Sequence, residues 1–159
     1  MAQPSLLTDL VWERGHRFHP DAVALADRHY SRRKVGSPQF VAPGRCIVLL
    51  TPCRRAVWVT HWPQAHLAMD GLDAWRCAMF RNEGAGLSSD LILAAMDETA
   101  RIWTDRPQDG WLTFVDRTKV PSENPGYCFK QAGWELDRTW THKRMVRLRA
   151  PADAKGHDA

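Results

Sequence analysis

The hydrophobic period of this chain changes after residue 86, and this change constrains the fold more than any other feature. The segment "AWRCAMF" has the short apolar run of a buried strand. Beyond it, apolar residues recur every three or four positions, which predicts a helix of about 17 residues, at Leu87, Leu91, Ile92, Ala95, Thr99, Ile102 and Trp103. The segment "DRPQDG" ends that helix and "WLTFVD" begins another strand. A strand–helix–strand unit therefore lies at the centre of the chain.

The flanking segments extend this pattern on both sides. A turn-forming "PCR" separates "RCIVLLT" from "RAVWVTHW", which predicts a hairpin, and "HPDAVALADRHYS" predicts a short helix before it. Between them, "SRRKVGSPQFVAPG" has the composition of a long loop. On the C-terminal side, "NPGYCFKQAG" predicts a short helix closed by Gly133, followed by two paired strands. We expect an α/β (α+β) fold with a mixed sheet and helices on both faces.

The length of 159 residues suits one domain, which we place at residues 1–150. The polar segment at 151–159 predicts a disordered tail. The N-terminus lacks the pattern of a signal peptide, and no apolar stretch approaches membrane-spanning length, so we expect no membrane partner. The cysteines form no CxxC pair and suggest the reduced thiols of a cytoplasmic protein, at Cys46, Cys53, Cys77 and Cys128.

The hexapeptide "RNEGAG", which joins the central strand to the long helix, predicts a site for a pyrophosphate. Gly84 and Gly86 let main-chain N–H groups approach a ligand closely, and a helix N-terminus adds unpaired donors. Ser88 and Ser89 add hydroxyl groups, and Arg81 adds a fixed positive charge. The alternative is a tight Gly-rich turn in which a serine caps the helix.

The charge of the chain favours an acidic partner such as nucleic acid or coenzyme A. The formal net charge is +4, and the runs "RHYSRRK" and "RTWTHKRMVRLR" concentrate the positive residues. The alternative is that both runs are solvated faces. Candidate contacts to nucleic-acid phosphates are Arg28, Arg32, Arg33, Lys34, Lys119 and Lys143. The eight tryptophans suit an aromatic core, or base stacking by Trp62 or Trp140.

The segment "HYS" places an imidazole, a phenol and a hydroxyl group in a row. Tyr30 is a candidate proton donor whose pKa nearby cations are expected to lower, His29 is a candidate base or metal ligand, and Ser31 follows them. Alternatively, Tyr30 packs under the loop and His29 lies on the surface. Asp116 ends a strand, where a carboxylate can accept a proton from an incoming amine, or simply form a turn.

The glycine turn, followed by Asn124, Phe129, Gly133 and Trp134 in "NPGYCFKQAGW", resembles the GNAT family of N-acetyltransferases over residues 20–149. The resemblance implies a mostly antiparallel twisted sheet in which two central strands splay apart near residues 75–80 and 111–116. It implies acetyl-CoA or a related CoA thioester between those strands, held by Phe80, Arg81, Asn82, Gly84, Gly86, Ser88, Ser89, Asn124 and Phe129.

One position departs from the family pattern. The family often has a tyrosine at the place of Phe129, where it protonates the leaving thiolate. Phenylalanine cannot do this, and Tyr127 lies about 200° away around a helix. The resemblance therefore implies that the proton donor comes from elsewhere in the chain.

The same segments together with "HYSRR" resemble a narrower group, the Mom-type DNA-modification proteins of phages and prophages. The resemblance implies carbamoylmethylation of adenine N6 in double-stranded DNA, which protects that DNA from restriction in the bacterial cytoplasm. His29, Tyr30, Ser31 and Asp116 would then line the active site, and the target base would leave the duplex. Because attachment through a methyl carbon is not ordinary acyl transfer, iron held by His29 and Asp116 is a further candidate.

Two other functions stay open from the sequence. One is an ordinary acetyl-CoA-dependent N-acetyltransferase acting on a small-molecule or protein amine. The other is a non-catalytic DNA-binding domain on an acyltransferase scaffold, for which Phe129 is the main argument.

Overall fold

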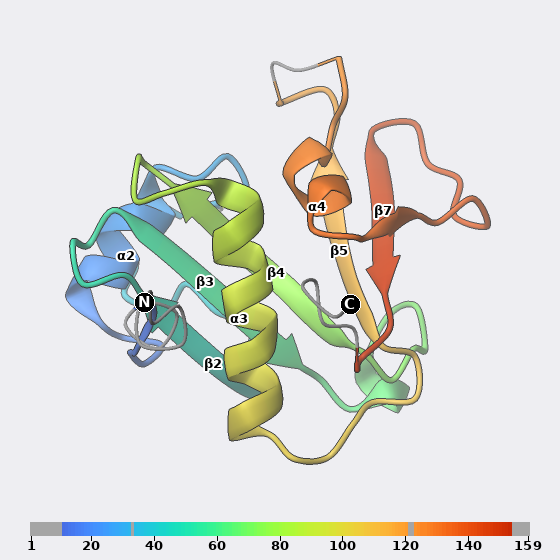
Figure 1. Ribbon diagram of the computed structural model, residues 1–159, viewed down its shortest axis with the longest axis horizontal. Helices are drawn as coiled ribbons and strands as arrows, with labels where there is room; N and C mark the ends of the chain where they lie inside the picture. The colour runs from blue at the N-terminus through green and yellow to red at the C-terminus, as the bar shows by residue number, and fades with distance from the viewer. Residues whose placement is uncertain (1–10, 33, 121–122, 154–159) are drawn as a thin grey trace, which may run out of the picture.

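The computed structural model describes residues 11–32, 34–120 and 123–153 of the chain (Figure 1). Its elements, in chain order, are β1 (Glu13–Arg14), α2 (Pro20–Asp27), β2 (Arg45–Leu50), β3 (Ala56–Trp62), the 3-10 helix η1 (Ala65–Leu67), β4 (Trp75–Asn82), α3 (Ser88–Ile102), β5 (Trp111–Asp116), α4 (Tyr127–Gln131), β6 (Glu135–Leu136) and β7 (Met145–Ala150). The predicted hairpin, long helix and central strands are confirmed. The predicted tail at 151–159 lies largely outside the described residues.

The described strands form one seven-stranded sheet in the order β1-β2-β3-β4-β5-β7-β6. The neighbouring strands are antiparallel except β4 and β5, which run parallel. A mixed α+β fold with a mostly antiparallel sheet is thus confirmed. Strand β1 was not predicted, and β6 is shorter than its sequence pattern suggested.

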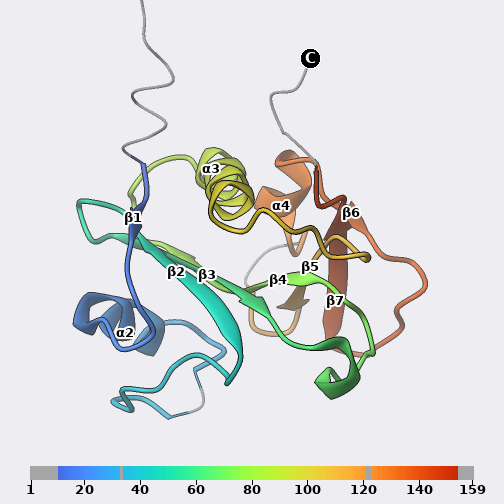
Figure 2. The same ribbon diagram turned by 90° about the horizontal axis from the view of Figure 1, so that it is seen from below.

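Helices cover both faces of the sheet, with α2 on one side and α3 and α4 on the other (Figure 2). Successive strand residues point to opposite faces, so β3 serves both cores. Its Val57 and Val59 pack with Leu25 of α2, whereas its Trp58 packs with Ile92 of α3. This alternation explains why β3 is apolar along almost its whole length.

Tryptophans form the centre of the core under α3 and α4. Trp58, Trp75 and Trp111 are fully buried, and their ring centroids lie 6.0 Å (Trp58–Trp111) and 5.2 Å (Trp75–Trp111) apart. Trp134 joins them, 5.8 Å from Trp111. These four rings account for half of the chain's tryptophans, so much of the tryptophan content is explained by packing.

The two parallel strands pair over only a short length. Trp75 pairs with Trp111 and Arg76 with Leu112, after which the β4–β5 ladder stops. Each strand stays paired with its outer neighbour to its end, β4 with β3 and β5 with β7. The register of β3 and β4 shifts between Val59 and Thr60, which leaves an extra residue on β4. Because a bulge bends its strand and increases its twist, it gives a local cause for the divergence of β4 from β5.

Candidate functional site

A cavity of about 180 Å³ lies where β4 and β5 diverge. Side chains of both strands form its walls, and the α4 region with Phe129 borders it on one face of the sheet. On the opposite face, His29 and Tyr30 border it just after α2 ends. The cavity thus touches residues from both faces of the sheet. The lining residues are His29, Tyr30, Cys77, Ala78, Met79, Phe80, Thr113, Phe114, Val115, Val120, Gly126, Cys128 and Phe129.

Of the four residues predicted to be catalytic, His29 and Tyr30 line this cavity, and Ser31 and Asp116 contact them from outside its lining. The rings of His29 and Tyr30 stack with centroids 4.5 Å apart, and Ser31 Oγ lies 2.8 Å from His29 Nδ1. The main-chain N–H of Asp116 donates a hydrogen bond of 3.3 Å to the Tyr30 hydroxyl oxygen. The Asp116 carboxylate itself accepts hydrogen bonds from the N–H and the hydroxyl of Thr118, at 2.9 and 2.6 Å. The carboxylate therefore stabilises the turn after β5, which is the role that the sequence left open beside a catalytic one.

Both rings are uncharged at neutral pH. Burial lowers the pKa of His29 to about 4, with the positive charge of Arg81 acting in the same direction, so the imidazole is neutral. Burial raises the pKa of Tyr30, so the expectation that cations would lower it is wrong. Because the Tyr30 oxygen already accepts a hydrogen bond from Asp116, its own proton remains available for donation. A neutral base and a protonated phenol thus sit side by side.

The glycine turn is folded by the side chain of Asn82. Its Oδ1 accepts hydrogen bonds from the N–H groups of Gly84 and Ala85, at 3.2 and 2.8 Å. Its Nδ2 donates to the Gly86 carbonyl and to Ser88 Oγ, at 2.7 and 2.9 Å. Gly84 has φ +93° and no atom within 4 Å of the position a Cβ would take, so its outer side is open. Two of the amides expected to bind a ligand are therefore used inside the turn.

The first turn of α3 retains main-chain donors. No described side chain caps this helix. Among the described residues, Leu91 is the first residue of the helix whose N–H donates to a main-chain carbonyl, that of Leu87. The preceding helical N–H groups, of Ser88, Ser89 and Asp90, are thus available to an anion, although Asp90 adds one negative charge beside them. A separate hollow of about 380 Å³ borders Ala85–Leu87. The turn follows directly on Phe80 and Arg81 at the end of β4.

A carboxylate that was not among the predicted site residues, that of Glu83, links the glycine turn to Arg28, which directly precedes His29. Glu83 accepts hydrogen bonds from Arg28 Nε and Nη2, at 2.7 and 2.9 Å, and from Arg81 Nε, at 2.5 Å. The hydrogen bonds from Arg28 and then Arg81 lower the pKa of Glu83 to about 2, so it is ionised. We call Arg28, Arg81 and Glu83 the Glu83 cluster. Its sequence signal was present in "RNEG", where an acidic residue follows an arginine.

The other predicted phosphate contacts differ in their surroundings. Arg32 donates to Asp27 and to the carbonyls of Ser37 and Gln39, and its side chain is only 6% exposed, so it holds the loop together. Arg33 lies outside the described residues. The structure leaves the remaining three on the surface, at Lys34, Lys119 and Lys143.

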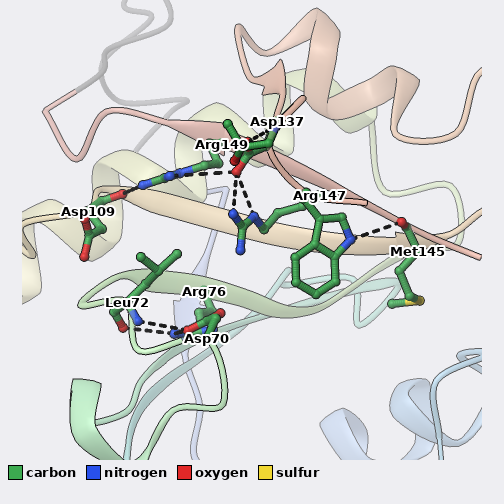
Figure 3. A network of polar contacts seen from close by, with 10 residues as sticks. Asp70, Leu72, Arg76, Asp109, Asp137, Met145, Arg147 and Arg149 are labelled. Atoms are coloured by element: carbon green, nitrogen blue, oxygen red, sulfur yellow. Dashed lines mark hydrogen bonds and ion pairs between the residues drawn. The ribbon is translucent and has the colours of Figure 1, made fainter. Parts of the chain in front are cut away.

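The C-terminal basic run is also partly structural, as Figure 3 shows. Arg147 is buried and donates to Asp137 at 2.8 Å, and Arg149 donates to the Asp109 carbonyl at 2.7 Å. On β4, which β5 separates from β7, both terminal nitrogens of Arg76 donate to Asp70. These arginines brace the β4–β5–β7 end of the sheet.

The two tryptophans considered for base stacking already have partners. The Arg45 guanidinium lies 4.4 Å from the ring centroid of Trp62, and that of Arg147 lies 4.8 Å from the centroid of Trp140. The ring of His142 stacks with Trp140 as well. Neither indole is therefore a ready platform for a displaced base.

The α4 region contributes an apolar wall. Phe129 is 6% exposed, and its ring centroid lies 6.2 Å from that of Phe80 and 5.0 Å from that of Trp134. Asn124 Oδ1 accepts a hydrogen bond of 2.6 Å from Lys130 Nζ. Tyr127 is 55% exposed and does not line the cavity. Phe129 cannot supply a proton here, whereas Tyr30 lines the same cavity and can.

A second hollow adjoins the cavity on the α2 face. It has a volume of about 230 Å³ and shares six lining residues with the cavity, which are His29, Tyr30, Cys77, Ala78, Thr113 and Phe114. Ser31, His61, Arg76, Leu112 and Met145 line this second hollow but not the cavity. It therefore gives a molecule on that face access to the stacked rings.

The residues of the site do not fit an iron centre. Among the described residues, no group of three or more His, Cys, Asp or Glu side chains is placed to hold a metal ion. His29 and Asp116 are each hydrogen-bonded to a hydroxyl group instead.

No helix in the described ranges is long and apolar enough to cross a membrane. Comparison with known proteins finds no match to this chain among protein-family models, curated proteins or solved structures.

Proposed function

We propose that this protein is a GNAT-type transferase that uses acetyl-CoA or a related CoA thioester and modifies adenine in DNA. One observation carries the proposal: β4 and β5 diverge around a cavity that α4 borders on one face and His29 and Tyr30 border on the other. Such an arrangement lets a donor and an acceptor approach from opposite faces of the sheet and meet between the strands.

The surroundings of the cavity fit the parts of a CoA thioester. A cavity of about 180 Å³ is smaller than sites that enclose whole drug-sized ligands, so it suits a narrow extended arm. The inner edges of β4 and β5 are unpaired beyond Arg76 and Leu112, and an extended chain with amide groups can bind such edges. Phe80 and Phe129 would contact the arm, and the N-terminus of α3 would hold the diphosphate. When bound, the thioester supplies an activated group and a thiol leaving group.

Tyr30 is the proton donor in this proposal. Its pKa is raised by burial, so the phenol is protonated at neutral pH, and Asp116 N–H fixes its oxygen. Neutral His29 can accept the proton that an acceptor amine loses. The pair thus moves protons in both directions without the tyrosine that Phe129 replaces.

Positive charge near the same end of the cavity supports a nucleic-acid acceptor. Hydrogen bonds from Thr118 lower the pKa of Asp116, and the charges of Arg144 and Lys119 act in the same direction, which places both cations near the end of β5. Phosphate groups of DNA bind such cations in a salt-dependent way. A base inside a duplex would have to leave the stack to reach Tyr30.

The proposal is tested by analysing nucleosides from DNA that has been co-expressed with the protein. We expect mass spectrometry to detect a modified adenosine that is missing from DNA of cells expressing Tyr30→Phe. We also expect acetyl-CoA to raise the melting temperature of the purified protein. The absence of any adduct on any base, together with binding of acetyl-CoA, would leave a CoA-dependent enzyme with another acceptor.

An ordinary N-acetyltransferase acting on a small-molecule or protein amine is the second candidate. The uncharged imidazole of His29 is compatible with it, because a neutral ring can sit beside an incoming amine without repelling it electrostatically. Transfer of a labelled acetyl group to amines, with no label in DNA, would identify this function.

A further inference from the structure

Two arginines and one carboxylate meet where the glycine turn approaches the catalytic segment. Glu83 uses both carboxylate oxygens to bind Arg28 and one of them to bind Arg81 as well. Arg81 comes from β4, whereas Arg28 follows α2 and lies 55 positions before Glu83 in the chain. We infer that Glu83 is an internal counterion that competes with the phosphate groups of a ligand for Arg28 and Arg81. This inference rests on the proposed site at the glycine turn, and it adds a residue that limits how tightly the site binds anions.

The Glu83 cluster keeps donors that a phosphate can use. Arg81 Nη1 and Nη2 and Arg28 Nη1 have no hydrogen-bond partner among the residues that the structure describes. The cluster carries two positive charges and one negative charge, so it still attracts anions. Gly84 beside it has open space where a side chain would stand, and the first N–H groups of α3 follow. Guanidinium groups bind phosphate through paired, charge-assisted hydrogen bonds.

The existing ion pairs are weak enough to be displaced. The side chains are 51% (Arg28), 33% (Arg81) and 27% (Glu83) exposed. Ion pairs that water can reach contribute little to stability, because water solvates the separated charges almost as well. A phosphate dianion carries more charge than Glu83 and offers more acceptor oxygens. It can therefore take over the arginines, but only against the repulsion of the carboxylate that stays nearby.

The role of Glu83 has to be tested by substitution. Hydrogen bonds from both arginines hold its pKa near 2, so no practical change of pH neutralises it in the folded protein. Glu83→Gln removes the charge and keeps the size of the side chain. We expect this variant to bind inorganic pyrophosphate about fivefold more tightly than the wild type at low ionic strength, as measured by isothermal titration calorimetry.

Glu98→Gln is the matched control. Glu98 forms an exposed ion pair with Arg101 on α3, so the substitution makes the same change of charge away from the turn. We expect pyrophosphate affinity to be unchanged in this control. Equal or weaker binding by Glu83→Gln than by the wild type would overturn the inference, and so would an equal gain in both variants. If Glu83→Gln fails to fold, Glu83→Ala removes the same charge and provides a second comparison.

The outcome separates this inference from the proposed function. Binding of acetyl-CoA to the wild type without a gain in Glu83→Gln would refute the counterion role and leave the transferase proposal standing. A gain in pyrophosphate affinity without any binding of acetyl-CoA would support the counterion role and refute the cofactor assignment.

Discussion

Replacing Tyr30 with phenylalanine separates catalysis from stability more cleanly than any other change in the site. The substitution removes a hydroxyl group that, among the residues the structure describes, makes one hydrogen bond, of 3.3 Å, to the main chain of Asp116. The residue is also 37% exposed, so solvent can satisfy the Asp116 N–H after the change. We expect a loss of at most about 1 kcal/mol in the free energy of unfolding. For a chain of this size, that corresponds to a melting temperature lower by at most about 4 °C.

The expected loss of activity is much larger. A positioned general acid contributes roughly 100- to 10,000-fold to a rate, which is about 3 to 5 kcal/mol of transition-state stabilisation. The assay is the fraction of modified adenosine in DNA sampled early after induction, normalised to the amount of protein. Thermal unfolding of the purified variant gives the change in stability.

The chain contains only one other tyrosine, which provides the control. Tyr127 is exposed on α4 and outside the cavity, so Tyr127→Phe should keep both activity and stability. Wild-type activity in Tyr30→Phe would refute the assignment of the proton donor. A loss of activity matched by a large drop in melting temperature would show instead that Tyr30 acts through folding.

Three further outcomes test other parts of the structure. Arg81→Ala should lower the apparent affinity for acetyl-CoA about tenfold in a thermal-shift titration, since it removes one charge-assisted phosphate contact. An unchanged titration would exclude Arg81 from the cofactor site. The pKa of His29 is lowered to about 4, so its contribution to stability is present above pH 6.5 and is lost as the pH falls toward 4. Wild type should therefore lose up to about 2 kcal/mol more than His29→Gln between pH 7 and pH 5 in urea unfolding, and parallel losses would contradict the buried neutral imidazole. Gly110→Ala should lower the free energy of unfolding by more than about 2 kcal/mol, because a Cβ there would lie 2.5 Å from the Ala150 carbonyl oxygen at φ +72°. Gly71→Ala is the control: its φ of +69° is similar but the space around it is open, so it should cost only about 1 kcal/mol. Equal losses in the two variants would refute the close packing at Gly110.

The sequence located most elements of the fold to within a few residues. The change of period after residue 86 placed the long helix, which runs from Ser88 to Ile102. The predicted strand that ended at Phe80 continues to Asn82. These features depend on neighbours a few positions away, which is why a local pattern is sufficient to find them.

The sequence did not locate the divergence of β4 and β5 on its own. The bulge beside Thr60 comes from how two strands pair, and no residue type marks it. The resemblance to a family predicted a separation in this region, and the register shows that the two strands pair only at Trp75 and Arg76 of β4.

Residue chemistry was predicted better than the surroundings of each residue. Tyr30 contacts both His29 and Asp116, but the expected direction of its pKa shift was wrong, because burial raises this pKa and no cation of the described residues is among the groups that shift it. Arg32 was counted as a phosphate contact from its charge, although three groups of its own loop bind it. In each case the partners are set by the fold.

By itself, the sequence determined which segments become strands and helices, their order, and a turn with two glycines before the long helix. Those outcomes follow from dihedral preferences and side-chain periodicity, which act over a few residues. Only the tertiary structure decided that Glu83 binds an arginine 55 positions away and that Tyr30 lies against Asp116. Contacts of this kind depend on strand register and helix packing, and these are fixed only when distant segments bury their apolar faces together.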